Sequence, residues 1–229
     1  MFMKEARTLR AKHKAEVREL ILAAAREAFV LEGHAQFTMR ELAQRLGCSP
    51  GAIYLHFSGK DELLRCLVEE SFAKLLEVLE KAPTGADPTA NLKAKLRAYV
   101  EFGLDYPHHY YVAFLLPQAA TSRGNLSTLT PHEAFAVLRR SVAECRSRGR
   151  MPAVDEEAAS QALWAAVHGI TSLLIAKPRF PWLERERLIR TVITMAVDGL
   201  GGAAPAPVGR APSARRRTGQ PARNGARHD

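Results

Sequence analysis

The sequence predicts an all-α fold, and three observations support that prediction. Apolar residues recur with the 3.6-residue period of a helix along nearly all of residues 14–200, whereas no alternating strand pattern of useful length appears. Helix start and stop signals separate the periodic segments. The composition, 47% hydrophobic and 25% charged over 229 residues, is that of a globular chain with a sizeable core.

The expected helices follow from apolar stripes. The first covers residues 14–31, with Val17, Leu20, Ile21, Ala24, Ala28 and Phe29 on one face. A longer stripe covers residues 61–81, and residues 82–89 are expected to form a linker because Pro83, Gly85 and Pro88 oppose a helix. Further helices are expected over residues 90–106, 110–122, 131–148, 156–176 and 183–200.

Capping signals support several of these boundaries. In TMRE, residues 38–41, the Thr38 hydroxyl and the Glu41 carboxylate can each cap a free backbone N–H. TPHE, residues 130–133, is a second such box, with Pro131 at the favoured first helical position. SGKD, residues 58–61, is a looser third example. Each box predicts a helix beginning at that point.

The net charge of +9 is unevenly distributed. Residues 1–60 contain ten Lys and Arg against six Asp and Glu, residues 61–201 contain seventeen of each, and residues 202–229 contain six Arg and one Asp. A basic segment attracts a polyanion such as nucleic acid or an anionic membrane face. Residues 202–229, rich in Arg, Pro, Gly and Ala, are predicted to be a disordered tail. Whether its arginines add to DNA affinity stays open.

The cellular setting is inferred from what the chain contains. Three cysteines without a C-x-x-C spacing favour neither a disulfide framework nor a zinc site, and they fit a reducing cytoplasm. The N-terminus has no apolar core behind its charges, so no secretory signal is expected. The longest mainly apolar run, residues 163–176, is too short and interrupted to span a bilayer. We therefore expect a cytoplasmic protein with no membrane partner.

Residues 38–57 have the pattern of a helix-turn-helix. After the first capping box a short amphipathic stripe ends at Gly47, which is a typical helix stop. Ser49 can cap a second helix with Pro50 in its first turn, in which Ile53 and Phe57 face the preceding stripe. The other face carries Gly51, Ala52, Tyr54 and Leu55. In such a unit the second helix enters the major groove of DNA.

The segment FTMRELAQRLGCSPGAIYLHFSGKDELL, residues 37–64, resembles the DNA-binding signature of the tetracycline-repressor (TetR) family of bacterial regulators. The resemblance implies a three-helix helix-turn-helix DNA-binding domain over residues 10–62. It also implies that the residues matching Tyr54, Thr38, His56 and Lys60 contact the DNA backbone. The residue matching Arg40 often reaches a base edge in that family. Cys48 departs mildly from the usual Val.

The predicted DNA-binding residues combine small, hydroxyl and basic side chains: Thr38, Arg40, Ser49, Pro50, Gly51, Ala52, Tyr54, Leu55, His56 and Lys60. Arginine suits guanine O6 and N7, and a lysine ammonium or a hydroxyl suits phosphate oxygens. Other roles remain open: Arg40 as a solvated charge, His56 as a structural side chain capping a loop, and Tyr54 as part of the core.

Residues 63–201 are expected to form a larger helical ligand-binding and dimerisation domain, as the resemblance implies. WAAVHG, residues 164–169, resembles the Trp-x-x-x-His-Gly (WHG) signature of one branch of these domains. An aromatic pocket for a hydrophobic or aromatic effector is predicted from Phe102, Tyr106, Tyr110, Phe114, Trp164 and His168. The favoured alternative is that His168 is a satisfied core histidine and not an effector contact, and the same holds for Trp164. No cofactor is expected, nor a metal at His108 and His109, because adjacent helical residues diverge.

Two further stripes suggest a homodimer. They comprise Ala159, Ala162, Leu163, Ala166, Val167, Ile170 and Leu174, then Leu188, Ile189, Val192, Ile193, Ala196 and Val197. Two such helical hairpins about a two-fold axis make a four-helix interface, although the stripes can instead close the monomer core. A dimer would read a palindromic operator.

The predicted function is a one-component transcriptional regulator, a repressor by family default, that leaves DNA when a small effector binds. Activation stays open. An architectural DNA-binding protein without an effector is the alternative. An enzyme is not expected, since no G-x-S-x-G, phosphate-binding glycine loop or H-E-x-x-H is present and Cys145 with a distant His is too generic.

Overall fold

The computed structural model describes residues 2–116, 129–151 and 155–201, and every element within these ranges is a helix. The all-α prediction is confirmed. The elements are α1 (Phe2–Gln36), α2 (Met39–Arg45), α3 (Pro50–Tyr54), α4 (Lys60–Glu80), α5 (Pro88–Asp105), α6 (Pro107–Tyr110), the π-helical turn η1 (Tyr111–Leu115), α7 (Leu129–Ser147), α8 (Glu156–Ala176) and α9 (Arg185–Gly201).

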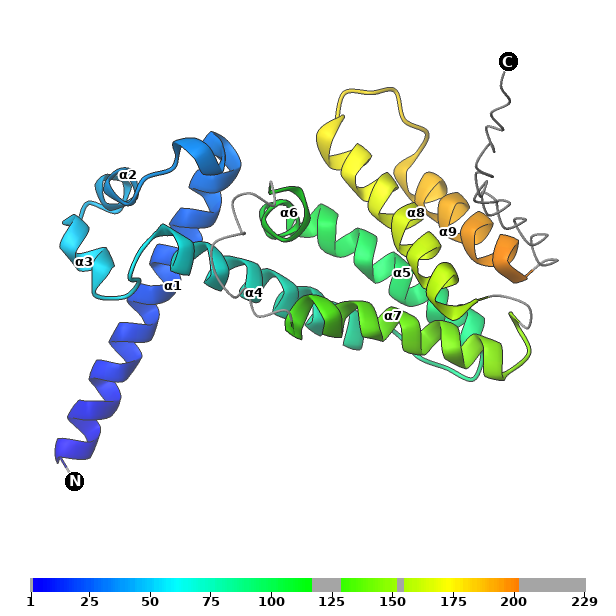
Figure 1. The fold of residues 1–229 in the computed structure, drawn as a ribbon, viewed down its shortest axis with the longest axis horizontal. Coiled ribbons are helices and arrows are strands. Elements are labelled where there is room, and N and C mark those ends of the chain that lie inside the picture. The colour runs from blue at the N-terminus through cyan, green and yellow to red at the C-terminus, as the bar shows by residue number, and fades with distance from the viewer. Residues whose placement is uncertain (1, 117–128, 152–154, 202–229) are drawn as a thin grey trace, which may run out of the picture.

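The helices form a smaller group and a larger group that share α4 (Figure 1). Helices α1, α2 and α3 cluster around the start of α4, while α5 to α9 pack along the rest of α4 and on one another. The predicted boundary between residues 62 and 63 falls inside α4. A movement of α4 would therefore displace residues in both groups.

The predicted boundaries hold best where an apolar stripe defines the helix. Helix α8 matches residues 156–176, and α4, α5, α7 and α9 begin and end within two residues of the prediction. Helix α1 was placed too late, at residue 14 instead of Phe2. Residues 2–13 are rich in Lys, Arg, Ala and Leu, which favour a helix by propensity without forming a stripe.

The segment expected as one helix over residues 110–122 is different in the structure. The chain turns into α6 already at Pro107, which suits a first helical turn, and continues into η1. Residues 117–122 lie outside the described part of the chain. The capping box expected at Thr130 also lies outside the described side chains, although the backbone of α7 begins at Leu129.

Helix α1 buries a face slightly rotated from the predicted stripe. Leu20 was placed in the core, yet it is 63% exposed, whereas Leu22 and Ala25 are buried beside Ile21. Phe29 stacks on Phe37 with ring centroids 4.2 Å apart. Both Leu20 and Ile21 fit a periodic stripe, so periodicity alone does not distinguish the face that meets α4.

The turn between α2 and α3 forms as the capping signals predict. The Thr38 hydroxyl accepts the Glu41 backbone N–H at 3.2 Å, and the Thr38 N–H donates to the Glu41 carboxylate at 3.1 Å. Gly47 takes φ of 65°, the left-handed conformation in which a side chain is strained. The Ser49 hydroxyl accepts the Ala52 N–H at 3.3 Å.

The third predicted box uses a different acid. The Ser58 N–H and hydroxyl both donate to the Glu62 carboxylate at 2.6 Å, and Asp61 takes no part. Helix α4 begins after Gly59, which has no side-chain cap. The hydrogen bonds from Ser58 hold down the pKa of Glu62. The start of the helix was therefore predicted correctly and its partner was not.

The stripes of α8 and α9 close the monomer core with only part of their length. Ala159, Leu163, Val167 and Ile170 of α8 and Ile189, Ile193 and Val197 of α9 are buried. Ala162 is exposed, and the remaining stripe residues are half-buried. The alternative that these stripes close the monomer is thus realised for the buried subset, while a second apolar surface remains outside.

Helix α8 extends the apolar run of residues 163–176 back to Glu156. It is the helix among the described ones whose 21 residues and mean hydropathy of 1.3 meet the length and composition required of a bilayer span. Only 33% of that apolar window is buried inside the chain. Its Asp155 cap, which accepts the Ala158 N–H at 2.7 Å, and its packing on α5 and α9 are features of a packed helix.

Gly103 permits a close approach between α5 and α8. A Cβ atom there would lie 2.2 Å from Thr171 Cγ2 and 2.9 Å from Tyr110 Cδ2. Both neighbours are fully buried. A side chain at this position therefore has no room without displacing α8.

We predict that Gly103→Ala lowers the free energy of unfolding by roughly 1–3 kcal/mol, because overpacking outweighs the gain in helix propensity. Thr171→Ser removes the closest clashing methyl group and keeps a hydroxyl for the bond to Val167 O. The Gly103→Ala/Thr171→Ser pair should be more stable than the sum of the single changes predicts. Denaturant unfolding of the four proteins measures this coupling, and simple additivity would contradict the close approach.

Candidate nucleic-acid interface and effector site

One face of α3 is open to solvent and the other is sealed into the core. Tyr54 and Leu55 are 52% and 78% exposed, while Ile53 and Phe57 are 0% and 1% exposed. Ser49, Pro50 and Gly51 are exposed too, and Ala52 is half-buried. The alternative of a core Tyr54 is therefore wrong. At the start of α3 the residues are small, so the backbone there is open to a close approach.

Arg18 of α1 contacts the residues that follow this short helix. Its guanidinium lies 4.3 Å from the centroid of the Phe57 ring and donates to Cys66 Sγ of α4 at 3.0 Å. It also reaches the His56 carbonyl at 3.5 Å. Sequence reasoning missed Arg18. Its position one residue after Val17 of the apolar stripe was the available signal, since a long basic side chain there can cover the stripe's edge.

Thr38 and Arg40 sit on the outer surface of α2. The Thr38 hydroxyl is engaged in the capping box, also donating to Glu41 at 2.7 Å, so a phosphate contact would have to compete with that bond. Arg40 is exposed and has no ion pair or hydrogen bond with the described residues. Its guanidinium is thus available for an outside partner.

Two residues of the predicted interface, Lys60 and His56, differ in how the fold engages their side chains. The Lys60 ammonium donates to the Phe37 carbonyl at 2.9 Å, and its partial desolvation lowers its pKa against the opposing effect of Asp61. His56 is half-buried, and its Nδ1 is buried without a hydrogen-bond partner in the described structure. Lys60 therefore ties the start of α4 to the loop after α1.

The larger helical group contains a hydrogen-bonded aromatic cluster. Tyr110 Oη lies 2.7 Å from His168 Nδ1 and 3.1 Å from Ser172 Oγ, and Tyr99 Oη lies 3.0 Å from the same His168 nitrogen. The Trp164 indole donates to Tyr99 Oη at 3.3 Å. Desolvation raises the pKa of both tyrosines and lowers that of His168, so the cluster is neutral.

Phe114 packs at the centre of this aromatic cluster. Its ring centroid lies 5.1 Å from Tyr110, 5.4 Å from His168 and 6.3 Å from Trp164. Of the six predicted pocket residues, the structure brings together Tyr110, Phe114, Trp164 and His168. Their polar atoms largely satisfy one another, which supports the reading of His168 as a satisfied core histidine.

The other two predicted pocket residues lie apart from these four. Phe102 is buried and pairs with Tyr106 at a centroid distance of 5.9 Å. Tyr106 is 38% exposed and holds the Lys74 ammonium 5.2 Å from its ring. Sequence reasoning missed Tyr99, which lies three residues before Phe102 on α5. That helical spacing was the signal for it.

Helix α6 connects the aromatic cluster to the smaller helical group. His109, next to Tyr110, lies with Nδ1 3.3 Å from Ser71 Oγ of α4. Close by, Arg26 of α1 pairs with Glu70 of α4 at 2.6 Å, while Arg26 Nε and Glu70 Oε2 are buried without hydrogen-bond partners. Helix α6 contacts both α1 and α4.

Burial holds the pKa of His109 down to about 4, helped by the positive charge of Arg26 and Lys74 and by His108. His109 is therefore neutral near pH 7. Among the described residues, no group of three or more His, Cys, Asp or Glu side chains is placed to hold a metal ion.

Comparison with known proteins agrees with this geometry. Residues 21–67 match the family described as "Bacterial regulatory proteins, tetR family", and residues 92–196 match "Tetracyclin repressor-like, C-terminal domain". The second range includes the WAAVHG segment. The two ranges cover both helical groups.

Individual relatives and structures are similar too. The HTH-type transcriptional regulator TtgR of Pseudomonas putida is 29% identical over 68% of this chain and 78% of its own length. The HTH-type transcriptional repressor AcnR of Corynebacterium diphtheriae is 40% identical over 27% of this chain and 33% of its own. The crystal structure of a tetR-family regulatory protein from Rhodococcus RHA1 has a TM-score of 0.68 at 22% identity, covering 82% of this chain and 98% of its own.

These findings define a helix-turn-helix transcriptional regulator of the all-α type. The chain belongs to the TetR family. Because the family and its relatives are transcriptional regulators, the expectation that the chain is not an enzyme is confirmed.

We predict that His109 makes stability depend on pH. Its folded pKa of about 4 lies below its ordinary 6.5, so between these values the unfolded chain binds more protons and stability falls as the pH is lowered. Allowing for partial exposure, the loss is about 1–2 kcal/mol. His109→Gln should flatten the profile of unfolding free energy over this window, leaving the contribution of His168.

The exposed neighbour His108, changed to Gln, is the matched control and should keep nearly the slope of the unmodified chain, because it contributes least among the causes that lower the pKa of His109. Parallel profiles for His109→Gln and the unmodified chain would contradict the predicted role of His109.

Proposed function

We propose that the chain is a cytoplasmic homodimeric repressor that binds a palindromic operator through α3 and releases it when a small hydrophobic or aromatic effector binds at the aromatic cluster. The observation that carries the proposal is the pair of faces of α3: Ile53 and Phe57 locked into the core, Tyr54 and Leu55 presented to solvent. A short helix held rigidly with its outer face open is what insertion into a major groove requires.

The division of labour on DNA follows from the chemistry of the exposed groups. Arg40, available on α2, is suited to read a guanine edge with its two-pronged guanidinium. The hydroxyl of Tyr54 can donate to a phosphate oxygen, which positions the helix and carries no sequence information. Gly51 and Ala52 allow the backbone of α3 to lie close to the groove. Lys60 and Thr38 remain proposed phosphate contacts. Each would have to bind phosphate in competition with the hydrogen bonds it already makes, to Phe37 and to Glu41 respectively.

The dimer is supported by apolar surface left open on α8 and α9. Leu173 is 48% and Met195 70% exposed, and Ala162 and Ala165 of α8 are exposed as well. Small residues on α8 let a second helix approach closely, so two α8–α9 pairs can form a four-helix interface about a two-fold axis. Two α3 helices would then reach major grooves about 34–36 Å apart, or somewhat more.

Effector control is supported by a chain of contacts that leads from the aromatic cluster through α6 and α4 to α1. Tyr110 belongs to the aromatic cluster, and its neighbour His109 contacts α4 at Ser71, beside the Arg26–Glu70 pair that joins α4 to α1. An effector that rearranges Tyr110 and Phe114 would bias α6 and therefore the angle of α4. Such coupling is typically ~1–3 kcal/mol and depends on differential affinity for the two states.

The alternative is an architectural DNA-binding protein without an effector. It would bind random and palindromic duplexes with similar affinity, whereas a specific regulator discriminates by a factor on the order of 10³ or more. Selection of bound duplexes from a random pool separates the two functions, because only a regulator enriches a palindrome.

We predict that Arg40→Ala relaxes the selected sequence at one base position in each half-site, with a loss of discrimination of about 1–3 kcal/mol. Tyr54→Phe should instead weaken binding to every duplex to the same extent, since it removes only a proposed phosphate contact. Competition binding at fixed salt measures both effects. Arg148→Ala, which removes an exposed arginine just after α7, is the control. A consensus unchanged by Arg40→Ala would rule out its proposed role.

We predict that Leu173→Glu combined with Met195→Glu raises the dimer dissociation constant by roughly 100-fold or more, because burying unpaired charges costs several kcal/mol. Sedimentation equilibrium measures the change. Leu20→Glu places the same charge at an exposed leucine of α1 and should leave the dimer intact. The proposed interface would be refuted if Leu20→Glu dissociated the dimer while the Leu173→Glu/Met195→Glu double variant did not.

A further inference from the structure

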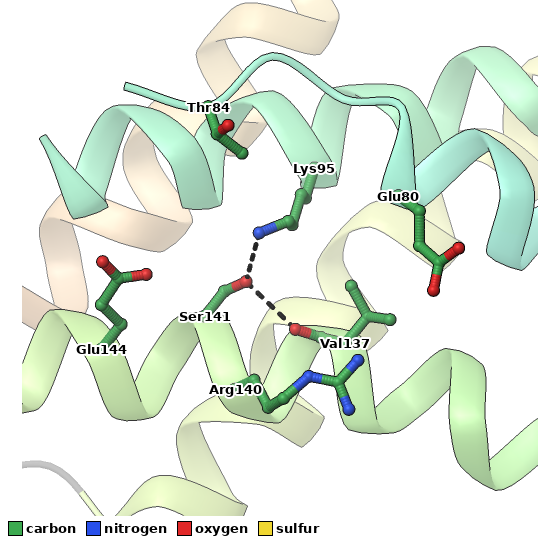
Figure 2. A pocket seen from close by; sticks show the side chains of 7 residues that line it. All are labelled: Glu80, Thr84, Lys95, Val137, Arg140, Ser141 and Glu144. Carbon is green, nitrogen blue, oxygen red and sulfur yellow. Dashed lines mark hydrogen bonds between the residues drawn. The ribbon is translucent and has the colours of Figure 1, made fainter. Parts of the chain in front are cut away.

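A pocket lies outside the aromatic cluster and shares no residue with it. It has a volume of about 250 Å³ and is formed where the end of α4 and the following linker meet α5 and α7 (Figure 2). Its polar lining consists of Glu80, Thr84, Lys95, Arg140, Ser141 and Glu144. The volume lies just below the ~300–1,000 Å³ of sites for drug-sized ligands, so it suits a smaller molecule.

Two cations in this pocket lack a carboxylate partner. Lys95 donates to Ser141 Oγ at 3.1 Å, and Ser141 in turn donates to the Val137 carbonyl at 3.0 Å, as Figure 2 shows. Lys95 has no ion pair with any described residue, and neither has Arg140. An ammonium has three donors, so two of those on Lys95 remain for another acceptor.

The neighbouring cations on the same helices behave differently. Lys93 pairs with Asp198 at 2.6 Å, and Arg97 is paired with both Glu101 and Glu186. Arg139 pairs with Glu157 at 3.2 Å, and Arg146 reaches Glu156 at 3.8 Å. Within the described parts of α5 and α7, the cations without a carboxylate are therefore the two that line the pocket.

The acids of the pocket are also without a strong partner. Glu80 has no ion pair with the described residues, and Glu144 meets only Arg148, at 3.9 Å. In Figure 2 the two carboxylates lie on opposite sides of Lys95. Opposite charges thus line one pocket without contacting each other, and the formal charge of its lining is zero. A ligand with charges of both signs would complement this arrangement better than a net anion or cation.

We propose that this pocket binds a small zwitterion of the amino-acid type, with one carboxylate and one ammonium group. The carboxylate lies between Lys95 and Arg140 and accepts charge-assisted hydrogen bonds from both. The ammonium lies toward Glu80 or Glu144. Lys95 is half-buried and its hydrogen-bond partner Ser141 is 4% exposed, so the Lys95 end of the pocket is partly desolvated, which strengthens ion contacts there. The site is separate from the proposed effector site and stands without it.

The test is calorimetric titration of the full chain with straight-chain ω-amino acids from glycine to 6-aminohexanoate. Each is compared with the carboxylic acid lacking the amine and the amine lacking the carboxylate. At least one amino acid should bind one per chain and at least tenfold more tightly than both of its matched compounds. The proposal is overturned if no member of the series exceeds its matched compounds.

Variants assign the binding to this pocket. Arg140→Met and Lys95→Met should each weaken the best amino acid at least tenfold, while Arg139→Met, a neighbouring arginine paired outside the pocket, should leave it unchanged. Replacing both Glu80 and Glu144 by Gln should reduce the affinity toward that of the matched acid. Arg140 is exposed, so its variant remains decisive if Lys95→Met fails to fold. Unchanged affinity in Arg140→Met would overturn the assignment.

Discussion

The packing of α3 against its neighbours is the constraint on which the structure depends. Five residues, Pro50–Tyr54, are far too few for a helix that stands alone, because isolated helices under ~12 residues are marginal in water. The helix persists because Ile53 and Phe57 are buried, Ser49 caps its start and Arg18 covers its end. Each of these anchors comes from the inner side or the ends of the helix. The side chains on the outer face therefore make none of the contacts that hold the helix in place. The position of that face is fixed by the inner side chains and the two ends of the helix.

Helix α4 belongs to both helical groups and makes different contacts along its length. In its first turn Lys60 donates to the Phe37 carbonyl before α2, and Glu62 accepts from Ser58. Its middle meets α1 through Glu70 and α6 through Ser71, and its end lines the polar pocket. Buried groups without partners, Arg26 Nε and Glu70 Oε2, lie at the junction of α1 and α4. Such incompletely satisfied contacts cost stability, so this junction is a less tightly determined part of the structure than the core around it.

The features that could be predicted from the sequence are those set by local chemistry. The capping box at Thr38, the left-handed Gly47 and the inward Ile53 each depend on residues within a few positions, and the structure has all three. The errors arise where a distant partner decides. Leu20 fits the stripe of α1 but is exposed, and Tyr106 is aromatic but lies at the surface with Lys74. The contacts of Arg18 and of the Tyr99 hydroxyl also depend on residues far away in the chain. Local spacing places each side chain on a face of its helix but does not identify its partner. The DNA and effector contacts themselves stay predictions.

Helix α8 shows why periodicity underestimates an apolar helix. Its buried residues, Leu163, Val167 and Ile170, form one face, while Ala162, Ala165 and Leu173 place further apolar surface on the other side. The apolar pattern of the sequence does not separate these two faces. The mean hydropathy of the helix, which counts both faces together, reaches the value required of a membrane span. A helix that is apolar on most sides is stable in water only when both faces are covered. The chain itself covers one face with α5 and α9, so the remaining face is what argues for a second copy, and the two-fold symmetry of such a pair is also what would match α3 to both halves of a palindrome.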